Sequence, residues 1–337
     1  MTQIVKWGVL STAEIAIKQV IPAIQKAENA NIEAIASESG KEIETAKAFS
    51  IPKTFTTYQG LLEDQEIDAV YIPLPNGLHS KWVKEAAERG KHVLCEKPAA
   101  LTAEEADEMT SFCEEHNVLF MEAFMYQFHP QHARVKEMIN AGEIGEVKHM
   151  NSRLSFVLHQ LEGNIRMDRQ LGGGSLYDLG CYCIHAIRMI TNSEPSRVYT
   201  IQDKHDLYNV DMSASTVMEL ENGVHASFDC SMGIAGRHSY EVVGTEGRIE
   251  VMKAYVPQLD GEGIIHIERE DGHQRTEKII GYYYPLGIEH FSTSILNGSE
   301  PIYSRESTVE NMKVLDACHR SIETKQVVDI ATVDNRN

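Results

Sequence analysis

The sequence predicts an α/β protein of two domains: a doubly wound parallel sheet over residues 1–124, then an α+β domain with a large open, mainly antiparallel sheet over residues 125–337. Three observations predict this. The length of 337 residues exceeds that of an ordinary single domain. Short apolar runs alternate with segments of helical period in the first part, and longer runs of alternating polarity fill the second.

Strand-like and helix-like segments alternate throughout the first domain. We expect strands at residues 4–10, 31–37, 68–74, 91–97 and 117–123, and helices at 14–28, 41–50, 77–89 and 103–116. The last helix is opened by a capping box, Thr102 to Glu105. This spacing implies βαβ crossovers and a parallel sheet, which binds ligands at the carboxyl ends of its strands.

The second domain is expected to be an antiparallel sheet interrupted by helices. A helix-like linker over 130–141 leads into strands such as "VHASFDCSM" and "HSYEVVG", which turn signals separate. One helix is expected over 174–190, after three glycines, and two more near 285–296 and 307–324. Because an open sheet leaves a wide face in water, we expect a homodimer or homotetramer that buries it.

Composition argues against several classes of function. The 50 acidic and 31 basic residues give a formal charge of −19, which disfavours binding to nucleic acid or an anionic membrane. The six cysteines form no C-x-x-C pair and have no histidine at zinc spacing, so we expect reduced thiols and no metal site. No signal peptide or membrane span is apparent, which predicts a cytoplasmic protein.

The segment "GVLSTAEIA", residues 8–16, lies where a strand passes into a helix. In the dinucleotide-binding pattern G-x-G-x-x-G, the glycines allow a tight turn, approach of the backbone to the pyrophosphate and close helix packing. Here Ser11, Ala13 and Ala16 occupy those positions. The alanines nearly meet their requirements, and the Ser11 hydroxyl could donate to a phosphate at the helix N-terminus. By itself, the segment favours a cofactor-binding turn and an ordinary strand-to-helix turn equally.

A second signal is "CEKP", at the end of the strand expected over 91–97. The ammonium of Lys97 would point from the carboxyl end of this strand into the ligand-binding crevice of the sheet. The alternative is a surface lysine in a loop. The apolar strand before Lys97 and the capped helix after it favour the crevice.

Five segments together resemble the glucose-fructose oxidoreductase/inositol dehydrogenase (Gfo/Idh/MocA) family. They are "WGVLSTAEIA", "AVYIPLPNGLHSKW", "GKHVLCEKPAAL", "EAFMYQFHP" and "GGGSLYDLGCYCIHAIR", in family order across nearly the whole chain. The resemblance implies an N-terminal Rossmann domain that binds NAD or NADP, and a C-terminal domain whose open sheet commonly serves for oligomerisation. It also implies oxidation or reduction of a carbinol or carbonyl carbon in a sugar, polyol or vicinal diol.

The resemblance assigns a catalytic set. Lys97 matches the family's active-site lysine, and Glu96 and Pro98 match flanks that shape the nicotinamide site. Asp178 and Tyr182 match its D-x-x-x-[H/Y] element. Tyrosine in that element is similar to the glucose-fructose oxidoreductase, xylose dehydrogenase and dihydrodiol dehydrogenase branch.

Spacing agrees with this assignment. Asp178, Tyr182 and His185 lie at i, i+4 and i+7, so a regular helix would present all three on one face. Carbonyl reduction creates an alkoxide that needs a proton, and a phenol beside an ammonium gives up its proton more readily. We expect Lys97 to orient the substrate oxygen, Tyr182 to transfer the proton and Asp178 to hold the lysine or a substrate hydroxyl. His185 is the other candidate acid, and a polar stripe on a solvated helix is the alternative.

Substrate-pocket residues are also implied by the resemblance. Relatives of this branch often carry tryptophan and arginine where Tyr126 and Gln127 stand, so a positive charge is missing here. Tyr283 and Tyr284 fall where the family contributes a pocket tyrosine, and core packing is the alternative. We select Tyr126, Gln127 and Tyr284.

Cofactor choice should depend on residues 37–41, after the second expected strand. NADP-using relatives often have serine and arginine there, and NAD-using relatives an aspartate. Ser37 follows the first pattern, Glu38 would repel a 2′-phosphate, and Lys41 could attract one. The balance favours NAD.

The expected cofactor contacts also include the loop Pro73 to His79, which resembles the family's cofactor loop with Asn76 and His79 near the nicotinamide ribose. Capping of the next helix is the alternative for His79. The expected cofactor-binding residues are Gly8, Ser11, Thr12, Ala13, Glu14, Ile15, Ser37, Glu38, Lys41, Pro73, Asn76, His79, Glu96, Lys97 and Pro98. Two rival functions remain: cleavage of glycosidic bonds with bound NAD on the same scaffold, and nucleotide sensing without catalysis.

Overall fold

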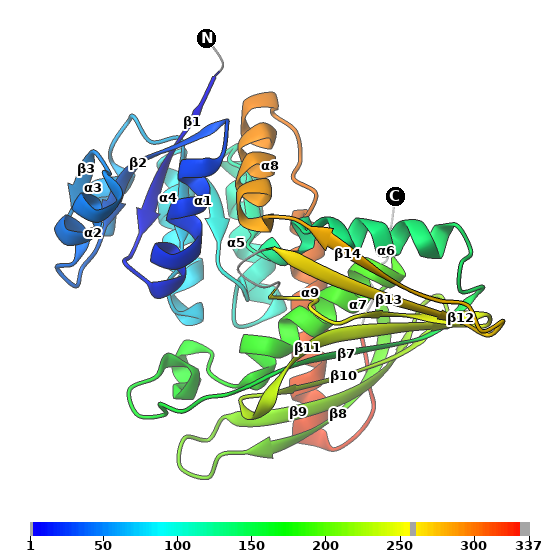
Figure 1. The fold of residues 1–337 in the computed structure, drawn as a ribbon. Coiled ribbons are helices and arrows are strands. Elements are labelled where there is room, and N and C mark those ends of the chain that lie inside the picture. The colour runs from blue at the N-terminus through cyan, green and yellow to red at the C-terminus, as the bar shows by residue number, and fades with distance from the viewer. Residues whose placement is uncertain (1–2, 257–260, 331–337) are drawn as a thin grey trace. The chain divides into compact units, whose positions relative to one another are not determined.

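The fold is given by a computed structural model, which describes residues 3–256 and 261–330. Contacts group the chain into two compact units. The first comprises the residues up to Phe128 together with Tyr282–Val309, and the second comprises His129–Gly281 together with the residues from Glu310 onward. The expected fold class is confirmed (Figure 1), while the expected boundary between residues 124 and 125 stays a prediction.

A six-stranded parallel sheet forms the first unit. Its order is β3-β2-β1-β4-β5-β6. The strands are β1 (Val5–Leu10), β2 (Ala30–Ala36), β3 (Lys53–Phe55), β4 (Ala69–Ile72), β5 (His92–Cys95) and β6 (Phe120–Glu122). The order reverses between β1 and β4, and parallel sheets bind ligands beside such a reversal. Strand β3 was not expected, because it has only three residues.

The helices of the first unit follow the alternation of the sequence. They are α1 (Ile21–Lys26), α2 (Glu42–Phe49), α3 (Tyr58–Leu62), α4 (His79–Glu88), α5 (Ala103–Glu115) and α8 (Tyr283–Asn297). A π-helical segment, η1 (Ala16–Val20), leads into α1, and the Ile21 N–H donates to the Ala16 carbonyl. Pro22 follows this wider turn, which suits a residue that lacks an N–H and crowds the carbonyl four positions back.

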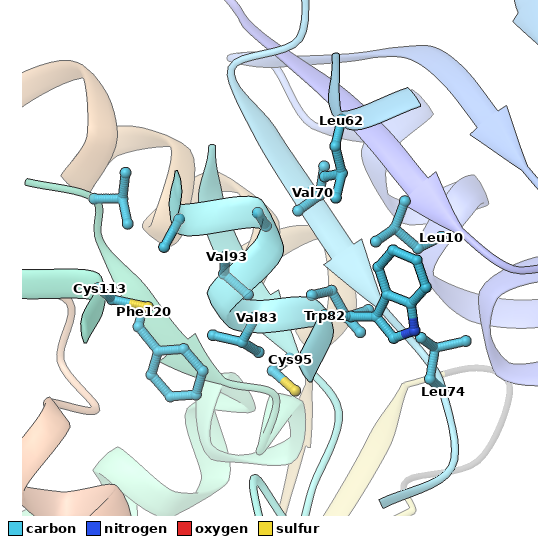
Figure 2. Packing of buried hydrophobic residues seen from close by; sticks show 14 of the residues in the cluster. Leu10, Leu62, Val70, Leu74, Trp82, Val83, Val93, Cys95, Cys113 and Phe120 are labelled. Atoms are coloured by element: carbon cyan, nitrogen blue, oxygen red, sulfur yellow. The ribbon is translucent and has the colours of Figure 1, made fainter. Parts of the chain in front are cut away.

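A buried apolar cluster joins the sheet to α3, α4 and α5 (Figure 2). Its members include Leu10 on β1, Val70 on β4 and Val93 on β5, each without exposed surface, and Val83 on α4. Burial of side chains of this size contributes about 1.5–3 kcal/mol each. The strands are therefore fixed by their apolar side chains, and their polar ends are left at the edge of the sheet.

The first unit is completed by a helix from the far end of the chain. Helix α8 packs on α1, β1 and β2. Trp7 of β1, which has no exposed surface, donates from Nε1 to Ser292 Oγ at 3.2 Å. Its ring lies 5.9 Å from that of Phe291. The sequence did not indicate that this helix belongs to the first unit.

A nine-stranded sheet forms the second unit, in the order β14-β13-β12-β11-β7-β10-β9-β8-β15. Neighbouring strands are antiparallel except for β7 and β10, which are parallel. The strands are β7 (Val147–Val157), β8 (Pro195–Lys204), β9 (Asp211–Leu220), β10 (His225–Ser231), β11 (Gly233–Gly244), β12 (Gly247–Val251), β13 (Glu262–Arg269), β14 (Gln274–Ile280) and β15 (Val328–Asp329).

Helices cover one face of this second sheet. They are α6 (Pro130–Asn140), α7 (Cys181–Thr191) and, within the second unit, the part of α9 (Arg305–Thr324) from Glu310 on. The opposite face carries charged side chains such as Arg153 and exposed apolar ones such as Tyr199, Ile201 and Val217 on β8 and β9. The expected homo-oligomer through this face stays a prediction.

The turn after β1 has an unusual backbone at Ser11. Its φ is 130°, a region that favours glycine, and this is the first glycine position of the dinucleotide pattern. The Ser11 N–H donates to the Ala36 carbonyl at 2.9 Å, and Ser11 Oγ accepts from the Ala13 N–H at 3.0 Å. The serine therefore takes the turn that glycine would take and adds a hydrogen bond across it.

We predict that Ser11→Gly is more stable than Ser11→Ala by about 1 kcal/mol or more, because both lose the hydroxyl and only glycine relaxes at this φ. Chemical denaturation of the two variants measures the difference. The same pair at Ser39, whose φ is not positive, should show the opposite order. Equal stability of the two Ser11 variants would contradict a strained turn.

Candidate active site

Hydroxyl groups gather where β1 and β2 end. Thr12 Oγ1 lies 3.3 Å from Ser37 Oγ, and Ser37 Oγ lies 2.8 Å from Ser39 Oγ. Ser37 is buried, whereas Glu38 and Lys41 are exposed beside it. The structure thus brings the turn after β1 together with the segment expected to select the cofactor.

The first residues of the helix after this turn differ in their exposure to solvent. Glu14 is exposed, Ala13 and Ile15 are half-buried, and Ala16 is buried. The Ile17 N–H is bonded to the Ala13 carbonyl at 3.1 Å. Because the first N–H groups of a helix lack intrahelical partners, this end can receive an anion.

Gly8, expected among the cofactor contacts, lies inside β1. It is buried, and an added Cβ would collide with the Leu61 side chain. Its small size therefore serves the packing of α3 on the sheet.

Tyr58, at the start of α3, was not selected from the sequence. Its ring meets the Trp82 ring edge-on at 4.9 Å, and Lys81 Nζ lies 4.8 Å from the centre of the Trp82 ring. Burial raises the pKa of Tyr58, and the charge of Glu38 adds to this effect. No local pattern could have found it, because its place depends on the unexpected strand β3.

The turn that carries Lys97 is fixed on both sides. Glu96 Oε1 accepts from Tyr71 Oη at 2.6 Å, and the Glu96 N–H donates to the Ile72 carbonyl at 3.1 Å. After the cis peptide bond to Pro98, the Ala99 N–H donates to Glu122 Oε1 at 2.9 Å. Lys97 is half-buried at the carboxyl end of β5. The sequence indicated Glu96 and Lys97, but not Tyr71 or Glu122, which come from neighbouring strands.

His79 links this turn to the loop after β4. It has no exposed surface, and its Nδ1 lies 2.9 Å from the Pro98 carbonyl and its Nε2 2.7 Å from the Leu74 carbonyl. Burial, with a smaller contribution from the charge of Lys97, lowers the pKa of His79 to about 4. A neutral imidazole has a single N–H, so His79 donates to one of these two carbonyls, and its ring lies between the two loops.

The remainder of that loop is less enclosed. Pro73 is buried, and Asn76 is half-buried at the start of the short 3₁₀ helix Asn76–Leu78. Both follow β4 directly. They therefore lie beyond the carboxyl end of the strand next to β1, beside the reversal in strand order.

The expected substrate-pocket residues lie on two elements that pack together, the 3₁₀ helix η3 (Met125–Phe128) and α8. Tyr126 is 1% exposed, and its ring meets that of Phe124 edge-on at 6.4 Å. Gln127 Nε2 is a buried donor without a hydrogen-bond partner among the described residues. The rings of Tyr283 and Tyr284 lie 4.7 Å apart, and burial raises the pKa of Tyr283 to about 12.

In the second unit, Asp178 lies in a π-helical segment, η6 (Leu176–Gly180), which runs directly into α7. Its Oδ2 accepts from Arg166 Nε at 2.7 Å. Arg166 comes from the 3₁₀ helix Ile165–Met167. Sequence reasoning missed this arginine, since nothing in its loop indicates that it returns to the helix.

Tyr182 and His185 have different surroundings on α7. Tyr182 is half-buried, with its ring 5.8 Å from that of Tyr255. His185 is 2% exposed, and burial lowers its pKa well below the ordinary value, helped by the charges of Arg188, His132 and Lys136. The wide turn of η6 makes the helix irregular, so a single face for all three expected residues does not follow from their spacing.

The donor set of the first unit fits a dinucleotide. The hydroxyl groups of Ser11, Thr12 and Ser37 suit phosphate and ribose oxygens, and the buried Ala16 allows close helix packing. Among the described residues, no group of three or more His, Cys, Asp or Glu could hold a metal ion. Within the same residues, no helix has the length and apolar character needed to cross a membrane.

Comparison with known proteins covers both units. Residues 5–124 match the oxidoreductase family with an NAD-binding Rossmann fold, and residues 132–250 match the GFO/IDH/MocA C-terminal domain. The chain is 38% identical over 327 residues to D-xylose 1-dehydrogenase (NADP(+)) 2 of Haloferax volcanii, covering 96% of this chain and 99% of that protein. It is 29% identical to trans-1,2-dihydrobenzene-1,2-diol dehydrogenase of Mus musculus over 79% of both chains.

A solved structure agrees with these matches. The 3-ketoreductase from Actinomadura kijaniata, in complex with NADP and TDP-benzene, superposes with a TM-score of 0.90 at 28% identity. The match covers 95% of this chain and 98% of that one. The resemblance in sequence is thus confirmed, and the chain belongs to the Gfo/Idh/MocA family of NAD(P)-binding oxidoreductases.

Proposed function

We propose that the chain transfers a hydride between a nicotinamide cofactor and a carbinol or carbonyl carbon of a sugar, polyol or vicinal diol. The observation that carries the proposal is the fixed turn of Lys97, held by Glu96 and Glu122 at the carboxyl end of β5. The named relatives, a xylose dehydrogenase and a dihydrodiol dehydrogenase, support this class of substrate. The bound nicotinamide supplies the hydride acceptor or donor.

Lys97 and Tyr182 handle the substrate oxygen in this proposal. The ammonium of Lys97 donates a hydrogen bond to that oxygen and stabilises the negative charge that develops during reduction. The phenol of Tyr182 gives its proton to the same oxygen, or takes it during oxidation. Solved structures of the Actinomadura reductase include a tyrosine-to-phenylalanine variant and lysine-to-alanine and lysine-to-glutamate variants.

Asp178 and His185 act differently from Tyr182. Since Arg166 already donates to the Asp178 carboxylate, we assign that pair to one wall of the substrate pocket, where it orients substrate hydroxyls. His185 is buried and its pKa is lowered, so it stays neutral near pH 7 and positions α7.

For the cofactor we propose NADP(H). Ser37, Ser39 and Lys41 offer donors for a 2′-phosphate, and the exposed side chain of Glu38 has room to turn away. The xylose dehydrogenase is named for NADP(+), and the Actinomadura 3-ketoreductase was solved in complex with NADP. We give these donors and relatives more weight than the repulsion between Glu38 and a 2′-phosphate, which was the reason to expect NAD from the sequence.

We predict that NADPH changes the fluorescence of Trp82, which contacts Tyr58, while Trp7 stays silent because it is buried against α8. Titrations with NADPH and NADH on Trp7→Phe and Trp82→Phe variants measure this.

We predict that Lys41→Ala weakens the binding of NADPH by about tenfold, equivalent to about 1.4 kcal/mol, and leaves the affinity for NADH unchanged. Lys47→Ala, which alters an exposed lysine of α2, the helix that follows Lys41, is the matched control. Tighter binding of NADH would reject NADP, and binding of neither would reject the cofactor site.

We predict that Lys97→Ala abolishes turnover while cofactor affinity stays within about tenfold, because Lys97 acts on the substrate oxygen. Tyr182→Phe should lower the rate by on the order of 10²-fold, as expected for a proton-transfer group. Absorbance of the reduced nicotinamide, with aldoses and vicinal diols as substrates, measures both rates. Tyr199→Phe, on the exposed sheet face, is the control. Unchanged turnover in the lysine variant would remove Lys97 from the mechanism.

A further inference from the structure

Asp211 is a buried carboxylate for which the proposed reaction has no direct use. It stands at the first position of β9 and is 6% exposed. Its Oδ2 accepts two hydrogen bonds, from Ser175 Oγ at 2.6 Å and from the Leu176 N–H at 2.7 Å. Both donors belong to the start of the helix that carries Asp178 and Tyr182. A carboxylate from a distant strand therefore fixes this helix at its first turn.

The backbone before the helix is shaped around the same carboxylate. Gly174 has a φ of 119°, and an added Cβ there would overlap Asp211 Oδ1. The Gly174 N–H donates to the Arg166 carbonyl at 3.0 Å. Arg166 in turn donates to Asp178. Hydrogen bonds therefore link the loop that carries Arg166 both to Gly174 and to the first turn of the helix. Gly174, the last glycine in "GGG", thus leaves the space that Asp211 needs.

Leu176 transmits this constraint into the helix. Its N–H is held by Asp211, and its carbonyl accepts from the Cys181 N–H five residues later, which closes the π turn. That turn sets the rotation of Tyr182, the next residue, relative to Asp178. A shift of Leu176 would therefore turn Tyr182 about the helix axis.

Burying this carboxylate has an energetic cost. Burial raises the pKa of Asp211, while the hydrogen bonds from Ser175 and Leu176 and the nearby His319 oppose that rise. A neutral side chain could fill the site without such a cost. The presence of a carboxylate despite this cost indicates that its role is to fix the positions of the groups that donate to it.

We infer that Asp211 is a positioning residue for the proposed reaction, which fixes the π turn at Leu176 and thereby the orientation of the Tyr182 phenol. This inference rests on the proposed function for its kinetic consequence. Without Asp211 the helix start would lose the acceptor shared by Ser175 and Leu176, and misplacement of a catalytic group by about 1 Å can cost 10²-fold in rate.

Asp211→Ala tests the inference, with Asp211→Asn as the conservative variant that keeps an accepting oxygen. We expect kcat to fall by about 10- to 100-fold in Asp211→Ala, with a smaller change in KM, because orientation matters most in the transition state. Asp211→Asn should recover kcat to within about threefold of the wild type, and cofactor affinity by Trp82 fluorescence should stay within about twofold in both. Ser175→Ala, which removes one donor only, should give an intermediate kcat.

Thr216→Val is the matched control. Thr216 lies on the same strand, is buried, and bonds to Thr200 at 2.9 Å. It should lower thermal stability without lowering kcat. Hydrogen exchange at residues 175–182 should increase in Asp211→Ala and stay unchanged in Thr216→Val.

The outcomes separate this inference from the proposed function. A wild-type protein that binds cofactor but turns over no aldose or diol would overturn the proposed function. An active wild type with unaltered kcat in Asp211→Ala, or with an equal loss in Thr216→Val, would overturn the positioning role alone. Failure of Asp211→Asn to recover kcat would also overturn it, since the accepting oxygen would then not be the feature that matters.

Discussion

The packing of β1, β4 and β5 on α4 is the constraint on which the candidate site of the first unit depends. These strands are parallel neighbours, and their apolar side chains meet in the cluster that includes Leu10, Val70 and Val93. A strand that is buried along its length cannot slide without exposing apolar surface, so its end is fixed. The turns after the three strands therefore stay at one edge of the sheet. These turns carry Ser11, Pro73 and Lys97.

The contrast between the whole-molecule charge and the local donor set follows from this edge. The formal charge is −19, yet the groups at the ends of β1 and β2 are chiefly neutral hydroxyls and backbone N–H donors. Neutral donors fixed in direction can hold an anionic phosphate without a concentration of lysines. A strongly acidic chain and a nucleotide site are therefore compatible.

The sequence predicted those features that depend on local pattern. The strands around Trp7 and Val93 and the cap at Thr102 follow from apolar runs and short-range capping rules. Features set by distant partners were missed. Arg166 returns to Asp178, Asp211 reaches across from β9, and β3 has too few residues to give a signal. The π turns were not predicted either, because the periodicity of apolar residues indicates only a regular α-helix.

The place of Trp7 has a consequence for how the protein is made. Its indole is buried against Phe291 and against Ser292, which lies 285 residues later in the chain. The ribosome releases the N-terminal strands first, and domains generally fold as they emerge. Here the β1 surface that α8 covers stays open until synthesis has passed Asn297. A nascent chain that already carries the six strands of the parallel sheet therefore leaves the Trp7 side of β1 uncovered until α8 has been made.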